Sequence, residues 1–307
     1  MKLLVNKIKR YLKLYSCLIR SSLMSVLIYR INSLMMGTTP IIWMLTTVAF
    51  ITVIFQKGSR IGNWDYWELM FLLGIHEFIY LLSWLTFVGN LIDFIRLVRL
   101  GRFDIILLRP VNHRFFVSFN SLDLSGVLGG VFNTIFLIGL SLSKLNFQIS
   151  TIRLIAFIFS LITSYLIFYF DSQNTVQLAG RMNATKKQTL LDLFQNTASA
   201  CCAVVYLIVF SIASLSLFFV KSETFIDWFM EITDFDRYPA DIYSNWFKYF
   251  LFSFLPVLFL AYTPASIFLG KLPEYFVIIG LVVFFALYLL STFLWQEGLK
   301  NYQSASS

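Results

Sequence analysis

The stretch that decides the fold is YFVIIGLVVFFALYLLSTFLWQ, residues 275–296, which carries no charged side chain. A helix needs about 20 mainly apolar residues to cross the hydrocarbon core of a bilayer, and this run meets that requirement. The sequence therefore predicts an all-α, polytopic membrane protein with six transmembrane helices. The other five runs of this kind are roughly 35–56, 66–90, 115–142, 152–172 and 197–220.

The composition favours the same class. Of the 307 residues, 58% are hydrophobic and 13% are charged, and the mean hydropathy is +0.76. Soluble domains carry about 25% charged residues, and a soluble core of this size could not absorb so much apolar surface. Cys17, Cys201 and Cys202 lack the spacing of metal ligands, so we expect small apolar side chains and no metal site.

The distribution of basic residues predicts the orientation, because cytoplasmic segments are rich in Lys and Arg. With six spans and a cytoplasmic N-terminus, the inner segments hold 16 of the 24 basic residues, and the C-terminus is also cytoplasmic. The segment after the fifth span is acidic, which suits the outer side. The inner basic residues are Lys2, Lys7, Lys9, Arg10, Lys13, Arg20, Arg30, Arg96, Arg99, Arg102, Arg109, Arg114, Arg181, Lys186, Lys187 and Lys300.

Residues 1–33 are basic and periodic. Apolar side chains recur every three or four positions, as at Ile8, Leu12 and Tyr15, with Lys9 and Lys13 on other faces. This pattern predicts an amphipathic helix at the inner membrane surface. A basic topology anchor with no further role is the alternative.

Residues 91–109 show a second amphipathic pattern, in which Asp93 and Arg96 interrupt an apolar face. Gly101 and Pro110 break helix continuity. The region 91–112, between the second and third spans, should therefore be a structured cytoplasmic helix and turn.

Ionisable side chains inside spans mark functional sites by default. His76 and Glu77 lie near the middle of the second span, and Asp123 lies in the first half of the third. Neighbouring helical positions point about 100° apart, so His76 and Glu77 should not pair with each other. The three side chains either line a translocation path or handle protons, or they fix helix packing. In the third span, Gly126, Gly129 and Gly130 favour close helix packing.

Catalytic motifs are absent from the sequence. It holds no GxxxxGK[ST] phosphate loop, no HExxH and no GxSxG. We therefore expect no enzyme activity, no bound cofactor and no nucleic-acid partner.

Two strings point to a family. LGRFDIILLRPVN, residues 100–112, resembles the cytoplasmic motif of a branch of the ABC-2 type permeases, G-x-x-D-x-x-L-L-R-P. The segment 233–270 resembles the second hallmark of that branch, an R-Y-P motif followed by prolines and a glycine. The matching positions are Gly101, Asp104, Leu107, Leu108, Arg109 and Pro110, then Arg237, Tyr238, Pro239, Ile242, Tyr243, Pro256, Pro264 and Gly270.

The resemblance implies one ABC-2 type transmembrane domain over 1–307, in the bacterial cytoplasmic (inner) membrane. It implies a permease subunit of an ATP-driven ABC exporter, dimeric with an identical or a related permease chain. Two copies of a soluble ABC ATPase subunit would bind ATP and Mg²⁺. It also places re-entrant helices in an outer loop, 221–274, which suits the apolar stretch 243–270 with its two prolines.

The resemblance also assigns roles to residues. The coupling helix that docks on the ATPase would lie between spans two and three, and Arg237, Tyr238 and Pro239 would form an outer gate or a turn. Attraction of the arginines to anionic membrane lipid is the alternative to docking. The ATPase-coupling candidates are Arg96, Arg99, Gly101, Arg102, Asp104, Arg109 and Pro110.

Two other functions remain open at this stage. A gradient-driven secondary transporter would need inverted repeats around midplane ionisable groups, and no repeat is visible. A membrane-embedded enzyme on lipid-linked substrates would need clustered catalytic residues, and none stands out.

Overall fold

The computed structural model describes residues 20–58, 60–108, 113–145, 197–218, 223–273 and 276–302. Within these ranges the regular elements are helices, and no strand occurs beyond a single bridge between Ile61 and Trp64. The all-α class is therefore confirmed for the described part of the chain. Of the expected interfacial helix, residues 20–28 are helical and lead into α2, whereas residues 1–19 lie outside the described residues.

In the described part of the chain, four helices are long and apolar enough to cross a membrane. The second of them is one continuous helix built from α3, a π-helical turn (η1) and α4. Its start is fixed by a capping box, in which the Asp65 N–H donates to the Glu68 carboxylate at 2.8 Å. The four are α2 (Arg30–Lys57), α3–η1–α4 (Tyr66–Ser83, Trp84–Val88 and Gly89–Arg99), α7 (Val127–Lys144) and α14 (Phe276–Asn301).

A fifth apolar unit is bent. α12 (Asn245–Ser253) is followed by η5 (Val257–Phe259) and α13 (Tyr262–Phe268), and the two halves differ in direction by 73°. The helix breaks at Pro256 because proline has no backbone N–H to continue the helical hydrogen bonds. The expected interruption of 243–270 is therefore confirmed. The candidate span 152–172 lies outside the described residues, so the count of six spans stays a prediction.

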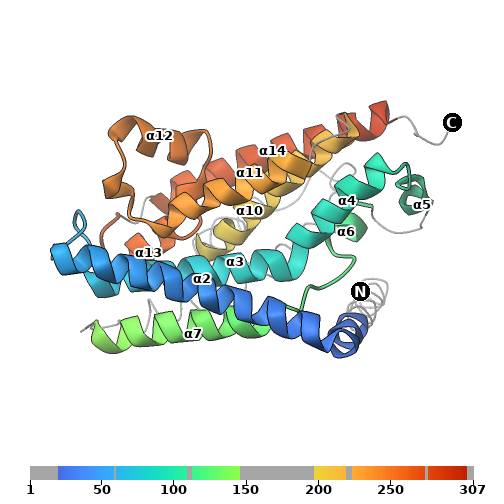
Figure 1. The fold of residues 1–307 in the computed structure, drawn as a ribbon. Coiled ribbons are helices and arrows are strands. Elements are labelled where there is room, and N and C mark those ends of the chain that lie inside the picture. Colours follow the sequence, from blue (N-terminus) through green and yellow to red (C-terminus); the bar gives the residue numbers. More distant parts are fainter. Residues whose placement is uncertain are drawn as a thin grey trace, which may run out of the picture.

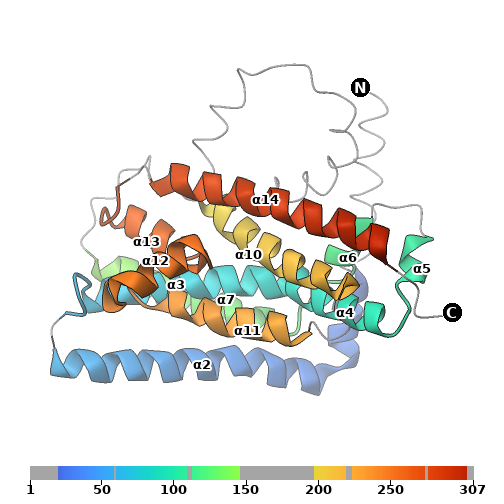
Figure 2. The ribbon, with the colours of Figure 1, turned by 90° about the horizontal axis from the view of Figure 1, so that it is seen from above.

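The bundle has two distinct ends (Figure 1). The α5 end holds the end of α4, α5 (Asp104–Leu107), α6 (His113–Ser118) and the C-terminal end of α14. The α12 end holds α12 and α13 together with the start of α3. Figure 2 shows the same arrangement from above, with α2 along one side and α14 along the other.

The direction of α10 (Thr197–Ser214) differs from the expectation for the fifth span. α10 and the following η2 (Leu215–Leu217) run from the α12 end to the α5 end, parallel to α14 (Figure 2). Leu217 packs against Gly298 near the end of α14. α11 (Glu223–Thr233) then contacts α4 and runs back toward the α12 end. The prediction that the region 221–274 is a loop on one side of the membrane was therefore wrong, because its acidic start lies at the α5 end and the region extends along the bundle.

The third span is also shorter than expected. The prediction was 115–142, but α6 ends at Ser118 and α7 begins at Val127. The link between them is held by the buried amide of Asn90, which donates to the carbonyls of Ser118 and Ser121 and accepts the Ser121 N–H. Because a side chain satisfies these backbone groups, the link needs no helix.

α3 forms the centre of the core and packs closely on α7. A Cβ at Gly74 would lie 2.7 Å from Ile138, and one at Gly130 would lie 2.7 Å from Leu81. A Cβ at Gly129 would overlap the backbone carbonyl of Gly37 in α2. The close packing expected from Gly129 and Gly130 is therefore confirmed, and it joins α7 to helices of the same chain. Gly126 precedes α7, and the nearest atom to a Cβ there would be 3.9 Å away.

Candidate functional site

The end of α4 sets the direction of the chain at the α5 end. Gly101 has a φ of +67°, in the left-handed region that favours glycine. The Gly101 N–H donates to the Val98 carbonyl at 3.0 Å, and the Arg102 N–H donates to the Leu97 carbonyl at 2.9 Å. These two bonds make a Schellman cap, so the helix break expected at Gly101 is confirmed.

The region 91–112 differs in one respect from a separate cytoplasmic helix. Residues 91–99 continue the long spanning helix, and α5 alone stands apart after the cap. Phe103 fixes α5 in place, because its buried ring packs edge to face on Phe94 and Tyr302 with centroids 5.2 Å away in each case. A corner joined to α4 and α14 in this way moves together with both helices.

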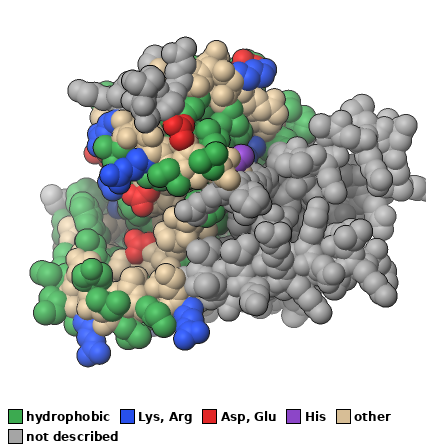
Figure 3. All heavy atoms as spheres, turned by 90° about the vertical axis from the view of Figure 1, so that its right-hand side faces the viewer, with side chains coloured by type: hydrophobic (Ala, Val, Ile, Leu, Met, Phe, Trp, Pro, Cys, Tyr) green, Lys and Arg blue, Asp and Glu red, His purple; other side chains and the backbone are tan. Residues whose placement is uncertain are grey.

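Figure 3 shows the α5 end of the molecule, where apolar, basic and acidic side chains are mixed on the surface. Leu108 is 85% exposed, and Leu100 and Ile105 are also exposed. The Arg102 side chain is exposed and makes no hydrogen bond or ion pair with the described residues, whereas the Arg96 side chain pairs with Asp93 of its own helix at 3.1 Å. Exposed apolar groups next to cations suit a partner with acidic and apolar groups. We call this set the corner surface: Arg96, Arg99, Leu100, Arg102, Ile105 and Leu108.

Asp104 begins α5 and is half-buried beside this surface. Arg109 and Pro110, the remaining coupling candidates, lie outside the described residues.

A second polar site brings together two groups of residues that the sequence analysis considered separately, the one at His76 and the one at Arg237. Arg237 lies in η3 (Asp234–Arg237), directly after α11, and its Nε–H donates to His76 Nε2 at 3.0 Å. A second guanidinium nitrogen of Arg237 lies 3.0 Å from a carboxylate oxygen of Asp234. Burial raises the pKa of Asp234, and the Arg237 charge opposes that shift. His76 is 4% exposed, so this polar contact lies inside the bundle.

Glu77 and Asp123 occupy different environments. Glu77 is buried and points to α7, where Asn133 donates to it at 3.4 Å and to the Pro40 carbonyl at 2.8 Å. His76 and Glu77 therefore have different partners, as expected from their spacing. Asp123 is exposed in the link before α7, where it accepts the Ser125 N–H at 3.0 Å and the Ser125 hydroxyl. The placement of Asp123 inside a span was wrong, because its carboxylate is used in a turn.

The Arg237–Tyr238–Pro239 segment forms a turn. Pro239 is buried between η3 and η4 (Ala240–Ile242), and Tyr238 is half-buried. Asp236 is fully buried, and its carboxylate accepts the N–H groups of Ala261 and Tyr262, the latter at 2.9 Å. Burial raises the pKa of Asp236 to about 8, although these two N–H groups act in the opposite direction. The turn therefore holds the start of α13.

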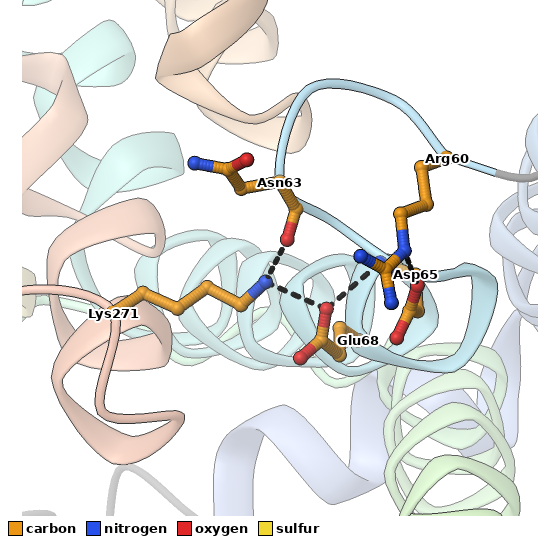
Figure 4. A network of polar contacts seen from close by, with 5 residues as sticks. All are labelled: Arg60, Asn63, Asp65, Glu68 and Lys271. Carbon is orange, nitrogen blue, oxygen red and sulfur yellow. Dashed lines mark hydrogen bonds and ion pairs between the residues drawn. The ribbon is translucent and has the colours of Figure 1, made fainter.

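Sequence reasoning missed a clamp at the α12 end (Figure 4). Lys271 Nζ donates to the Asn63 carbonyl and to the Glu68 carboxylate, the latter at 2.6 Å. The same ammonium lies 4.6 Å from the centroid of the Trp64 ring. A lysine at the end of a long apolar run was the available signal, but its partners lie 203 and 208 residues away.

Arg114 was counted only as a topology charge. Its side chain is buried, donates to the Ser291 hydroxyl at 2.6 Å and to the Thr292 hydroxyl at 3.2 Å, and lies 4.4 Å from the Phe210 ring centroid. It therefore ties α6 to both α14 and α10 at the α5 end.

The comparison with protein families finds one match over most of the chain. The model described as ABC-2 family transporter protein matches residues 41–179 and 181–306. Neither the search of curated proteins nor the search of solved structures gives a match.

Proposed function

Because the chain belongs to the ABC-2 transporter family, we propose that it is the membrane-spanning permease subunit of an ATP-driven exporter. In this proposal ATP and Mg²⁺ bind a separate soluble ATPase subunit, present in two copies. The permease works as a dimer with an identical or a related chain, and lies in the bacterial cytoplasmic membrane. The α5 end, which holds the C-terminal end of α14, faces the cytoplasm.

The corner surface is the observation that supports this proposal most directly. The Schellman cap at Gly101 and the buried ring of Phe103 hold the corner in one position. Exposed leucine and isoleucine side chains that lie together are costly to leave in water without a use, and the exposed arginines beside them favour an acidic partner. A rigid corner of this kind suits the docking of a soluble partner.

The helix behind the corner offers a route for the motion. α4 continues through η1 into α3, so one helix of 34 residues runs from the corner to the α12 end. Phe103 and Arg114 connect the same corner to α14. We expect ATP-driven closure of the ATPase pair to displace the corner and to tilt these helices, which opens the α12 end and releases the substrate.

The test is purification of the tagged chain in mild detergent, followed by mass spectrometry of its partners. We expect a stoichiometric P-loop ATPase, and the Arg99→Glu/Arg102→Glu variant should lose it. Like charges brought together across an interface cost several kcal/mol, so binding should weaken by roughly a hundredfold or more.

The matched control is Arg60→Glu/Lys144→Glu, which changes the net charge equally with exposed residues at the α12 end. Unchanged ATPase recovery with the corner variant would refute docking at this surface. If the native chain and both variants are folded but none of them recovers an ATPase, the proposal is refuted and a gradient-driven transporter is favoured.

A further inference from the structure

The short turn η3 is fastened on two sides. On one side, Arg237 donates to His76 of α3 at 3.0 Å. On the other, the Asp236 carboxylate accepts the N–H groups of Ala261 and Tyr262 at the start of α13. η3 therefore links the centre of the bundle to the bent unit of α12, η5 and α13.

Hydrogen-bond chemistry restricts the charge of His76 in this arrangement. A guanidinium has donors but no acceptor, so the nitrogen facing Arg237 must carry a lone pair. His76 is then a neutral imidazole with its proton on Nδ1. An imidazolium has no acceptor nitrogen, and its formation would place two cations within 3.0 Å of each other.

Among the described residues, charged and titratable groups approach His76 from η3 and from α3 itself. η3 contributes Arg237 and Asp234, and α3 itself contributes Glu77 and the Tyr80 ring, whose centroid is 6.2 Å from that of His76. From α7, Asn133 faces Glu77. The side chain of Asp234 is 47% exposed and contacts Arg237, which in turn contacts the buried imidazole.

We propose that His76 is a proton-binding site that controls a latch between α3 and η3. With neutral His76, Arg237 is held and the α13 unit is closed on α3. Protonation of His76 removes the acceptor and repels Arg237, which frees η3. Burial and the neighbouring Arg237 cation both oppose a charge on the imidazole, so protonation requires a pH below the usual range of histidine and the latch responds only to acid.

The Lys271 clamp decides how the freed unit moves. Lys271 still joins the end of α13 to Asn63 and Glu68 (Figure 4). The unit therefore swings about the clamp, and the displacement is largest at η3. This inference goes beyond the proposed function, because it requires neither the ATPase nor a substrate.

Nitrogen NMR can read the latch directly, because the chain has two histidines, His76 and His113. The full chain is labelled with ¹⁵N-histidine in detergent micelles, and a His113→Gln variant assigns the signals. At pH 8 we expect the Nδ1–H tautomer at His76, and loss of this preference in Arg237→Met. An Nε2–H tautomer, or an imidazolium at pH 8, would overturn the proposal.

Distance measurement tests the motion. Spin labels at Glu231→Cys, near η3, and Lys144→Cys, at the end of α7, are placed in a chain whose native cysteines are replaced by serine. We expect the Glu231–Lys144 distance to change between pH 8 and pH 5. In His76→Gln it should stay at the closed value, because the amide oxygen still accepts from Arg237 without titrating. In Arg237→Met it should be open at both pH values.

A label pair at Arg60 and Lys144, outside the moving unit, is the control for general loosening and should not respond. The proposal fails if His76→Gln shows the same pH response as the native residue. It also fails if the distance is unchanged while NMR shows His76 protonated, or if His76 takes up no proton down to pH 5.

Discussion

The two ends of the bundle use their charges in different ways. At the α12 end, cations bind partners on other segments: Lys271 joins α13 to Glu68 of α3, and Arg237 joins η3 to His76. At the α5 end, buried Arg114 joins α6 to α14 and α10, but the exposed ion pairs Arg96–Asp93 and Lys300–Glu297 each lie three residues apart within one helix. Charges that cross-link segments stabilise the chain itself, whereas exposed charges on one helix remain available to a partner. The α12 end is thus closed by its own residues, and the α5 end presents a surface.

The largest effect should come from removing the anchor of the α5 end. Phe103→Ala deletes a fully buried ring that touches α4 and the end of α14, and we expect a loss of about 3 kcal/mol in the free energy of unfolding. ATPase recovery should fall as well, because the corner is no longer fixed. Unfolding in mixed micelles and affinity purification measure the two effects.

Leu108→Ala is the matched control, because that side chain is exposed. It should leave the stability unchanged while it weakens ATPase recovery. A loss of stability with Leu108→Ala, or no loss with Phe103→Ala, would contradict the assignment of Phe103 as the buried anchor and Leu108 as an exposed docking residue.

Between the two ends, the bundle depends on the close crossing of α2 and α7. Gly129→Ala places a methyl group on the Gly37 carbonyl and forces α2 away from α7, so we expect a loss of roughly 1–3 kcal/mol. Gly139 lies on the same helix with nothing near its Cβ position. Gly139→Ala should therefore be neutral or stabilising by up to about 1 kcal/mol. Equal stabilities of the two variants would contradict the close crossing.

The clamp at the α12 end should contribute less. Lys271→Met removes a largely buried ion pair and a cation–π contact, and we expect a loss on the order of 1–2 kcal/mol. The comparison variant is Arg60→Met, whose ion pair with Asp65 is exposed and should contribute below about 1 kcal/mol. If Arg60→Met proves the more destabilising in thermal unfolding, burial does not explain the strength of the clamp.

The smallest effect is a dependence on pH at Asp236. Its pKa is raised from 3.8 to about 8 by burial, so between these values the folded chain holds a proton that the unfolded chain has lost. Stability therefore falls as pH rises, by about 1 kcal/mol between pH 7 and 8. Asp236→Asn, which cannot titrate, should flatten this slope in unfolding measured at the two pH values. A slope that persists in Asp236→Asn assigns the titration to another group.

Much of the helical structure could be predicted from composition and from local backbone chemistry. The apolar runs predicted spanning helices, Gly101 predicted the break after α4, and Pro256 predicted the bend after α12, because each effect arises within a few residues of its cause. The predicted bounds of the third span were wrong because their cause lies far away in the sequence. The run 115–142 contains enough apolar residues for a span, but Asn90, which is 28 and 31 residues away in sequence, donates to the carbonyls of Ser118 and Ser121 and holds the link in a non-helical form.

The candidate sites divide in the same way. The sequence by itself determined the membrane class, the family motifs and the presence of ionisable groups at His76, Glu77 and Arg237. The tertiary structure alone decided that Arg237 meets His76 across 161 residues, that Lys271 meets Glu68, and that α10 runs parallel to α14. The physical reason is that helix formation depends on local hydrogen bonds and hydropathy. Pairing between helices depends on which of many similar apolar faces pack together, and no local pattern encodes that choice.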